Sequence, residues 1–138
     1  MDILPMDVIQ IMINLYYTPQ LKSIEDDNQF YLQMIYPQHQ INMRVPLLSV
    51  SRYGRSYRPI YDTDSIINII NQIDQNEETQ LLLKDPFDFN LTVNKNNVII
   101  SCDDIQMTIT IKNTETIRQQ LINVLSHYYE FMCFYSPD

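Results

Sequence analysis

Three of the five arginines in this chain and three of its ten tyrosines lie within one eleven-residue segment, residues 51–61. Guanidinium groups bind phosphate or carboxylate through paired hydrogen bonds, and tyrosine rings stack on bases. The segment is therefore a candidate site for an anion or a protein partner, through Arg52, Tyr53, Arg55, Tyr57 and Arg58. Three interpretations stay open: a loop folded against the protein's own acidic groups, a contact with an acidic protein, or a contact with nucleic acid.

The residue types that catalyse reactions or bind metals are sparse. The two histidines, His39 and His127, and the two cysteines, Cys102 and Cys133, lack the close spacing of a zinc site. No glycine-flanked serine or cysteine motif marks a nucleophile. We therefore expect no catalytic residues, no metal and no cofactor, and we expect His127 to be a partly exposed histidine on a helix.

Aromatic residues crowd the last predicted helix, where residues 128–135 read Tyr-Tyr-Glu-Phe-Met-Cys-Phe-Tyr. They fall on every side of a helix, and one helix of a small domain does not easily bury them all. A surplus of exposed apolar surface indicates an interface, most simply a two-fold dimer. We predict interface residues Tyr128, Phe131, Met132 and Tyr135; the alternative is a terminal helix that is fully buried.

Composition limits the possible classes. The 138 residues, 45% of them hydrophobic, are enough for one domain, residues 1–138, with a core of its own. A net charge of −8 disfavours nucleic acid and anionic membranes as partners. With one glycine and no alanine, the chain lacks the glycine-rich loops of Rossmann and P-loop nucleotide-binding folds.

The beginning of the chain carries Asp2 and Asp7 where an export signal would carry lysine or arginine. We therefore expect no export signal and no membrane span, a cytoplasmic location, and reduced thiols at Cys102 and Cys133. For a viral protein this location would be the host cytoplasm or the viral factory.

The hydrophobic periodicity predicts three helices, at residues 4–17, 62–75 and about 114–135. Alternation predicts a hairpin from Phe30–Tyr36 and Ile41–Leu47, with Pro46 placing its second strand at an edge. Three more strands are expected at residues 87–93, 98–102 and 105–111, with Leu81–Leu83 extending the first of them. Residues 25–28 are expected to form a solvated turn.

These elements predict an α+β fold in the order α-β-β-α-β-β-β-α. About five strands would form one antiparallel sheet that is exposed to solvent on one face and covered by helices on the other. Ile105, Met107, Ile109 and Ile111 should share the apolar face, and Thr108 and Thr110 should face the other way.

The usage of amino acids is skewed toward residues with AT-rich codons. The chain has 20 Ile and 12 Asn, but no Ala and no Trp. This skew resembles that of proteins from giant DNA viruses and their virophages, and AT-rich bacteria and protists share it. The resemblance implies a viral or virus-like protein of no characterised family.

Residues 3–12, Ile-Leu-Pro-Met-Asp-Val-Ile-Gln-Ile-Met, resemble the beginning of an F-box, in which a Leu-Pro pair opens a helix. The resemblance implies an adaptor that links a substrate to a ubiquitin ligase. It covers about ten residues, and beyond Tyr17 alternating strands replace the helices of that family.

The order of elements, the size and the acidity also resemble those of the chaperones of type III secretion, which are small acidic homodimers. From these observations we expect a non-enzymatic protein-interaction module that forms a homodimer. The alternative functions are a nucleic-acid or phosphate binder acting through residues 52–58, an F-box-like adaptor, and a secretion chaperone.

Overall fold

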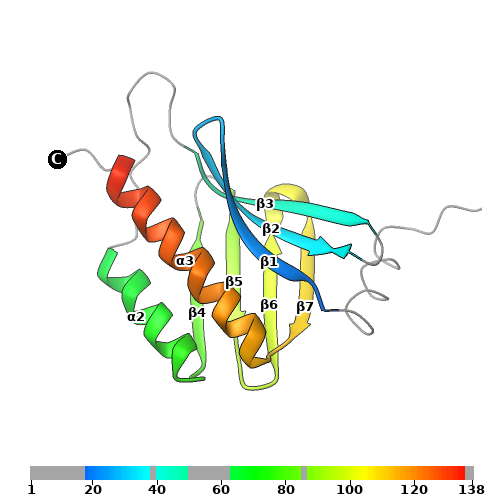
Figure 1. Cartoon of the computed structure of the whole chain (residues 1–138). Coiled ribbons are helices and arrows are strands. Elements are labelled where there is room, and N and C mark those ends of the chain that lie inside the picture. The colour runs from blue at the N-terminus through cyan, green and yellow to red at the C-terminus, as the bar shows by residue number, and fades with distance from the viewer. Residues whose placement is uncertain (1–17, 38–39, 50–62, 85–86, 136–138) are drawn as a thin grey trace, which may run out of the picture.

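The computed structural model describes residues 18–37, 40–49, 63–84 and 87–135 (Figure 1). The predicted helix at residues 4–17, with its F-box-like beginning, lies outside these residues. The described elements are β1 (Gln20–Asp26), β2 (Gln29–Tyr36), β3 (Ile41–Ser49), α2 (Thr63–Asp74), β4 (Thr79–Leu83), β5 (Phe89–Val93), β6 (Asn97–Cys102), the short 3-10 helix η2 (Asp103–Ile105), β7 (Met107–Lys112) and α3 (Glu115–Tyr135).

The predicted α+β class and the antiparallel pairing are confirmed, but the prediction of one sheet of about five strands is wrong. The described strands form two antiparallel sheets, a three-stranded one in the order β1-β2-β3 and a four-stranded one in the order β4-β5-β6-β7. The helices predicted near residues 62–75 and 114–135 correspond to α2 and α3.

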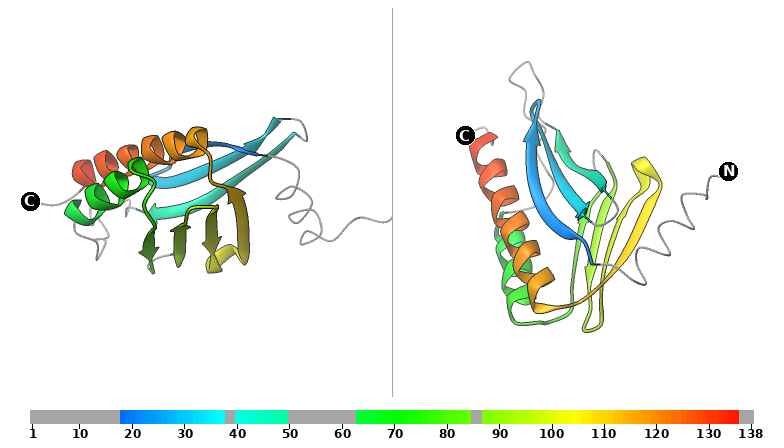
Figure 2. Two further views of the ribbon diagram at one scale, coloured as in Figure 1. Left: turned by 90° about the horizontal axis from the view of Figure 1, so that it is seen from below. Right: turned by 45° about the vertical axis from the view of Figure 1, so that its right-hand side comes forward.

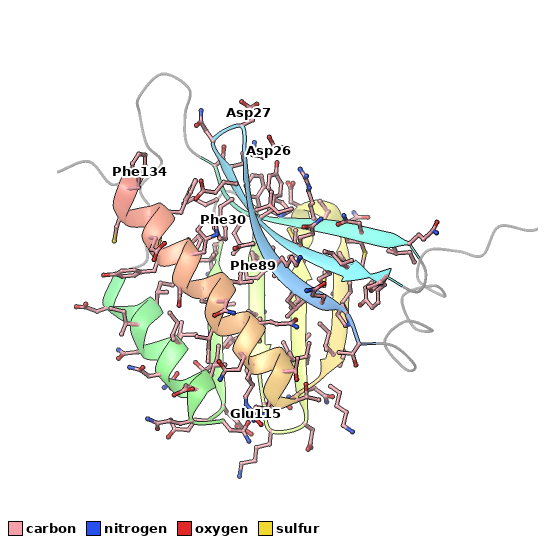
Figure 3. All side chains as sticks on the ribbon, in the orientation of Figure 1. Asp26, Asp27, Phe30, Phe89, Glu115 and Phe134 are labelled. Atoms are coloured by element: carbon pink, nitrogen blue, oxygen red, sulfur yellow. The ribbon has the colours of Figure 1, made fainter. Side chains whose placement is uncertain are left out.

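The two sheets and the two helices form two layers. The four-stranded sheet is one layer, and α2, α3 and the three-stranded sheet lie together over one of its faces (Figure 2). Buried side chains from all of these elements form one hydrophobic cluster between the layers. Phe30 of β2 and Phe89 of β5 contribute to this cluster from opposite layers, and both are almost fully buried (Figure 3).

The extra strand β1 occupies residues that were expected to contain a solvated turn. It pairs with β2 along its whole length, from Gln20 opposite Ile35 to Asp26 opposite Gln29. The turn is reduced to Asp27 and Asn28, both with positive φ, as in a tight hairpin turn. The strand was missed because two positions on the side that faces α3, Ser23 and Glu25, are polar and make hydrogen bonds instead of hydrophobic contacts.

Strand β4 was expected to continue directly into the next strand, and this expectation is wrong. β4 and β5 are antiparallel neighbours, with Leu83 opposite Phe89, so the chain reverses between them. Leu81 and Leu83 face the core, whereas Leu82 points outward and is 37% exposed. A run of three leucines therefore contains the ordinary alternation of a strand that is buried on one face.

Ile105 was expected to share the apolar face of the last strand, and this is also wrong. It lies in η2 and is 43% exposed, and Gln106 adopts a left-handed conformation with φ of 49° before β7 begins at Met107. Met107, Ile109 and Ile111 are buried as predicted, while Thr108 is exposed and Thr110 half-buried.

The beginning of α3 also follows the prediction. Thr114 caps the helix, since its Oγ1 accepts a hydrogen bond from the Ile117 amide at 3.2 Å. In the turn before β6, the Asn94 side chain accepts hydrogen bonds from the amides of Asn96 and Asn97. These local polar contacts end β5 and fix the β5–β6 hairpin.

Tyr36, at the end of β2, is only 1% exposed. Its hydroxyl has no hydrogen-bond partner among the described residues. Burial raises the pKa of Tyr36 to about 12, so the neutral phenol is the form that fits this part of the core.

Candidate functional site

The segment with interleaved arginines and tyrosines lies outside the described residues. The interpretation of Arg52, Tyr53, Arg55, Tyr57 and Arg58 as an anion-binding or partner-binding site therefore stays a prediction. Among the described residues, acidic side chains outnumber basic ones.

The aromatic end of α3 is placed differently from the interface that we predicted. Tyr128, Phe131 and Met132 are 0%, 2% and 4% exposed, so all three belong to the chain's own core. The Phe30 ring lies 5.4 Å from the rings of both Tyr128 and Phe131. The side chain of Tyr135 lies outside the described residues.

Burial argues against an interface at Tyr128, Phe131 and Met132, whereas Tyr135 stays a prediction; the three side chains are buried because α3 has more neighbours than one sheet. It packs against α2 on one side and β1 on the other, above the four-stranded sheet (Figures 1 and 2). At the C-terminal end of α3, Phe134 is 79% exposed (Figure 3).

One cluster of polar side chains joins a strand to a helix across more than a hundred sequence positions. Ser23 and Glu25 stand on the face of β1 that is turned toward α3, and both contact His127. The Ser23 Oγ lies 2.6 Å from Nδ1 of His127, and Oε1 of Glu25 lies 2.7 Å from its Nε2. The imidazole and the Phe30 ring also pack edge to face, with centroids 5.0 Å apart. As predicted, His127 is partly exposed, at 36% of its side chain.

A serine, an imidazole and a carboxylate in series also occur in hydrolytic triads. Here the serine lies in the middle of a strand, paired with Leu32 of β2, rather than at a sharp turn that would expose its hydroxyl. About two turns earlier in α3, Gln120 Oε1 accepts a hydrogen bond of 2.7 Å from the Leu21 amide of the same strand. We interpret the Ser23–His127–Glu25 cluster and Gln120 together as the attachment of the β1 edge to α3.

We expect His127→Ala to lower the free energy of unfolding by about 1–2 kcal/mol. The substitution removes both hydrogen bonds and the ring contact, and partial exposure limits the effect. In a double-mutant cycle, Ser23→Ala and His127→Ala should be non-additive by at least about 0.5 kcal/mol.

The control for this cycle is Asn123→Ala, an exposed position on the same helix, which should change stability by less than about 0.5 kcal/mol. Urea denaturation followed by circular dichroism measures all of these values. Strictly additive effects of the Ser23 and His127 substitutions would show that the two side chains do not hold β1 to α3.

Cys102 is a core residue rather than a reactive thiol. It is buried at the end of β6, and its Sγ donates a hydrogen bond to the Phe87 carbonyl at 3.2 Å. Burial raises the pKa of Cys102, which keeps the thiol protonated. The pKa of the exposed Asp88 is raised because its carboxyl shares a hydrogen bond with Asp103.

The other cysteine, Cys133, is exposed on α3 and is also free of any disulfide. A hydrogen bond with Cys133 raises the pKa of Tyr129, one helical turn earlier. In the part of the chain that the structure describes, no group of three or more His, Cys, Asp or Glu side chains is placed to hold a metal ion.

The second distinctive feature of the structure lies on the outer face of the four-stranded sheet, which is turned away from the helices. Two central rows of side chains, each running across the strands, carry no charge. The pairing register aligns each row across all four strands. We call these eight side chains the uncharged platform: Leu82, Asn90, Ser101 and Thr108 in one row, and Gln80, Thr92, Ile99 and Thr110 in the other.

The members of the uncharged platform are exposed or half-buried, so their side chains are available at the surface. Weak hydrogen bonds connect some of them: the Asn90 Oδ1 accepts from Gln80 Nε2 at 3.3 Å and from Thr92 Oγ1 at 3.4 Å. Charged residues stand at the ends of the strands instead: Glu78, Lys84, Asp88, Asp103 and Lys112.

Sequence reasoning predicted that Thr108 and Thr110 face outward, but it did not identify the uncharged platform. Its members come from four separate strands, and each strand alone looks like an ordinary amphipathic one. The signal is the absence of Lys, Arg, Asp and Glu at outward positions within the strands, apart from Lys112 at the end of β7, and it becomes visible only once the register is known.

Comparison with known proteins gives no relative from which a function could be transferred. No protein-family model, no curated protein and no solved structure matches this chain. Within the described residues, no helix has both the length and the hydrophobicity that are needed to cross a membrane.

Proposed function

We propose that this chain is a non-enzymatic protein-binding module and that the uncharged platform is its binding surface. The observation that carries the proposal is the complete lack of charge in two rows of four residues, on a protein with a net charge of −8. The centres of protein interfaces are depleted of charged residues, whereas their rims are polar. The charged residues at the strand ends form such a rim.

The chemistry of the platform fits a protein better than other partners. It offers no Lys or Arg within its rows for the phosphates of a nucleic acid. It lacks the aromatic rings on which bases stack, whereas its hydroxyl and amide groups both donate and accept hydrogen bonds. Its eight residues would form the centre of an interface, since a complete one involves about 20–30 residues on each side.

The AT-rich type of composition supports a viral or virus-like source as part of this proposal. A virus-encoded module of this kind would act by contacting host or viral proteins.

The proposal is tested by placing one charge at the centre of the platform. Thr92 lies on the inner strand β5, and Thr92→Lys would bury an uncompensated cation in any interface formed there. Buried unpaired charges cost several kcal/mol, so we expect binding to partners to weaken at least about 100-fold. The readout is affinity purification from the native cells, with mass spectrometry of the bound proteins.

The matched control is Asn68→Lys, which adds the same charge at an exposed position of α2, outside the platform. Proteins that bind the unmodified chain should also bind this control and should be lost from Thr92→Lys. Circular dichroism would establish that both variants fold. Retention of the same proteins by all three chains, or recovery of none by any of them, would contradict the proposal.

A further inference from the structure

Among the described strands the two sheets have four edges, and three of these edges carry features that prevent further pairing. β1 is attached to α3 through Gln120 and His127. β3 contains Pro46, which has no amide hydrogen, next to an irregularity in the pairing with β2. β4 lies beside α2, where the side chains of Thr79 and Gln72 are hydrogen-bonded. Natural sheets protect their edges by such means.

The fourth edge, β7, has none of these features within the described residues. Its sequence, Met-Thr-Ile-Thr-Ile-Lys, has no proline, no bulge and no charge before its last residue. Among the described strands it pairs with β6 alone. Figure 1 shows it at the end of the four-stranded sheet farthest from α2.

The direction of the main-chain groups in β7 follows from one hydrogen bond. The Asn113 amide donates to the Asn96 carbonyl at 2.9 Å, one step beyond the pair Asn97–Lys112. In an antiparallel ladder, alternate residues point their N–H and C=O groups to the same side. Ile111, Ile109 and Met107 therefore bond to β6, and Thr108, Thr110 and Lys112 direct theirs to the open edge.

We propose that a second copy of this chain pairs with β7 through this edge, antiparallel and about a two-fold axis at Thr110. In this register Thr110 faces its own symmetry mate, and Thr108 faces the partner subunit's Lys112. All three residues with outward main-chain groups are then paired, and the two four-stranded sheets become one of eight strands.

A second copy fits this edge better than an arbitrary peptide, because the strand is complementary to itself. The pairing places no like charges opposite each other, and Thr–Thr and Ile–Ile pairs stabilise antiparallel strands. The buried apolar face of the sheet would also continue from one chain into the other, since Ile109 of one chain would lie opposite the partner subunit's Ile111. Isologous contacts of this kind close into a dimer without leaving a free edge at β7.

The first test is the mass of the full chain in solution. Sedimentation equilibrium at about 1–200 µM should give twice the monomer mass of 16.5 kDa. Thr110→Pro should give a monomer, because proline removes an outward N–H while the bonds of Ile109 and Ile111 to β6 remain. Thr110→Ala retains that N–H and should stay dimeric. A monomeric unmodified chain, or a dimeric Thr110→Pro variant that is folded by circular dichroism, would overturn the inference.

The second test examines the register through charge. Thr108→Lys would place a cation beside the partner subunit's Lys112, twice in each dimer, and should raise the dissociation constant about tenfold at low salt. Thr108→Glu would place an anion there and should lower it. Overall charge acts in the opposite sense, because Lys reduces the net charge of −8 and Glu increases it. A weaker dimer with Glu and a stronger one with Lys would refute this register.

The dimer is separable from the binding function proposed above. Thr92 lies on β5, two strands away from the β7 edge, so Thr92→Lys should leave the dimer mass unchanged. Loss of partner proteins without loss of the dimer would support both statements, and loss of the dimer in Thr92→Lys would count against the edge as the interface.

Discussion

Replacing Phe131 by alanine should lower the free energy of unfolding by about 3–5 kcal/mol. Phe131 is 2% exposed and faces Phe30 across the boundary between α3 and the three-stranded sheet. Truncation of a buried phenylalanine removes its hydrophobic contribution and leaves a cavity that the neighbouring side chains fill only in part. Urea denaturation, with the midpoint and slope both measured, gives the change in stability.

Phe134 is a matched control on the same helix, three residues later. Because it is 79% exposed, Phe134→Ala should cost less than about 1 kcal/mol. Comparable losses from the two substitutions, or a small loss at Phe131, would mean that α3 is rotated. The aromatic residues would then again be available for an interface between chains.

The two substitutions also show what the sequence pattern of α3 could and could not predict. The spacing of apolar residues correctly predicted a long helix, whose beginning is capped by Thr114. The pattern shows how much apolar surface the helix has, but not how many neighbours it has. α3 packs against α2, β1 and β2, and Phe30 of β2 lies against Tyr128 and Phe131. This arrangement follows from long-range contacts that no local window contains.

The strands also differ in how well the sequence pattern predicted them. Strands β5, β6 and β7 have apolar residues at every inward position, and the ends of each strand were predicted to within two residues. On the side of β1 that faces α3, Leu21 is followed by the polar residues Ser23 and Glu25, both hydrogen-bonded to His127, so the alternation of the strand is hidden. Sequence periodicity detects strands that pack hydrophobically, and it misses a strand whose inward contacts are polar.

The number of sheets was beyond prediction for a related reason. The alternation of β2 and β3 is as regular as that of β5 to β7, and nothing in the local pattern says that the two groups pair separately. The separation comes from α2, which lies between β3 and β4 in the chain and packs beside α3. The uncharged platform has the same origin, since it exists only once four strands are in register.

Ile109→Ala should cost about 2–5 kcal/mol, because Ile109 is 1% exposed at the middle of β7 and opposite Ile100 in the core. Thr108, the residue before it, is exposed on the outer face, and Thr108→Ala should cost less than about 1 kcal/mol. Each substitution keeps the main-chain groups of the strand, so the comparison isolates the two faces of the sheet.

The contrast between neighbours matters more than either value. Both substitutions truncate a β-branched residue to alanine within the same strand, so the loss of strand propensity is similar and largely cancels. What remains is burial, which differs between the two faces of a sheet with alternate residues inside and outside. The difference in stability would be obtained from urea midpoints, all measured at one protein concentration well above the dissociation constant of any dimer. Equal shifts would mean that β7 is covered on both faces, and the outer face of this sheet could then not be an open binding platform.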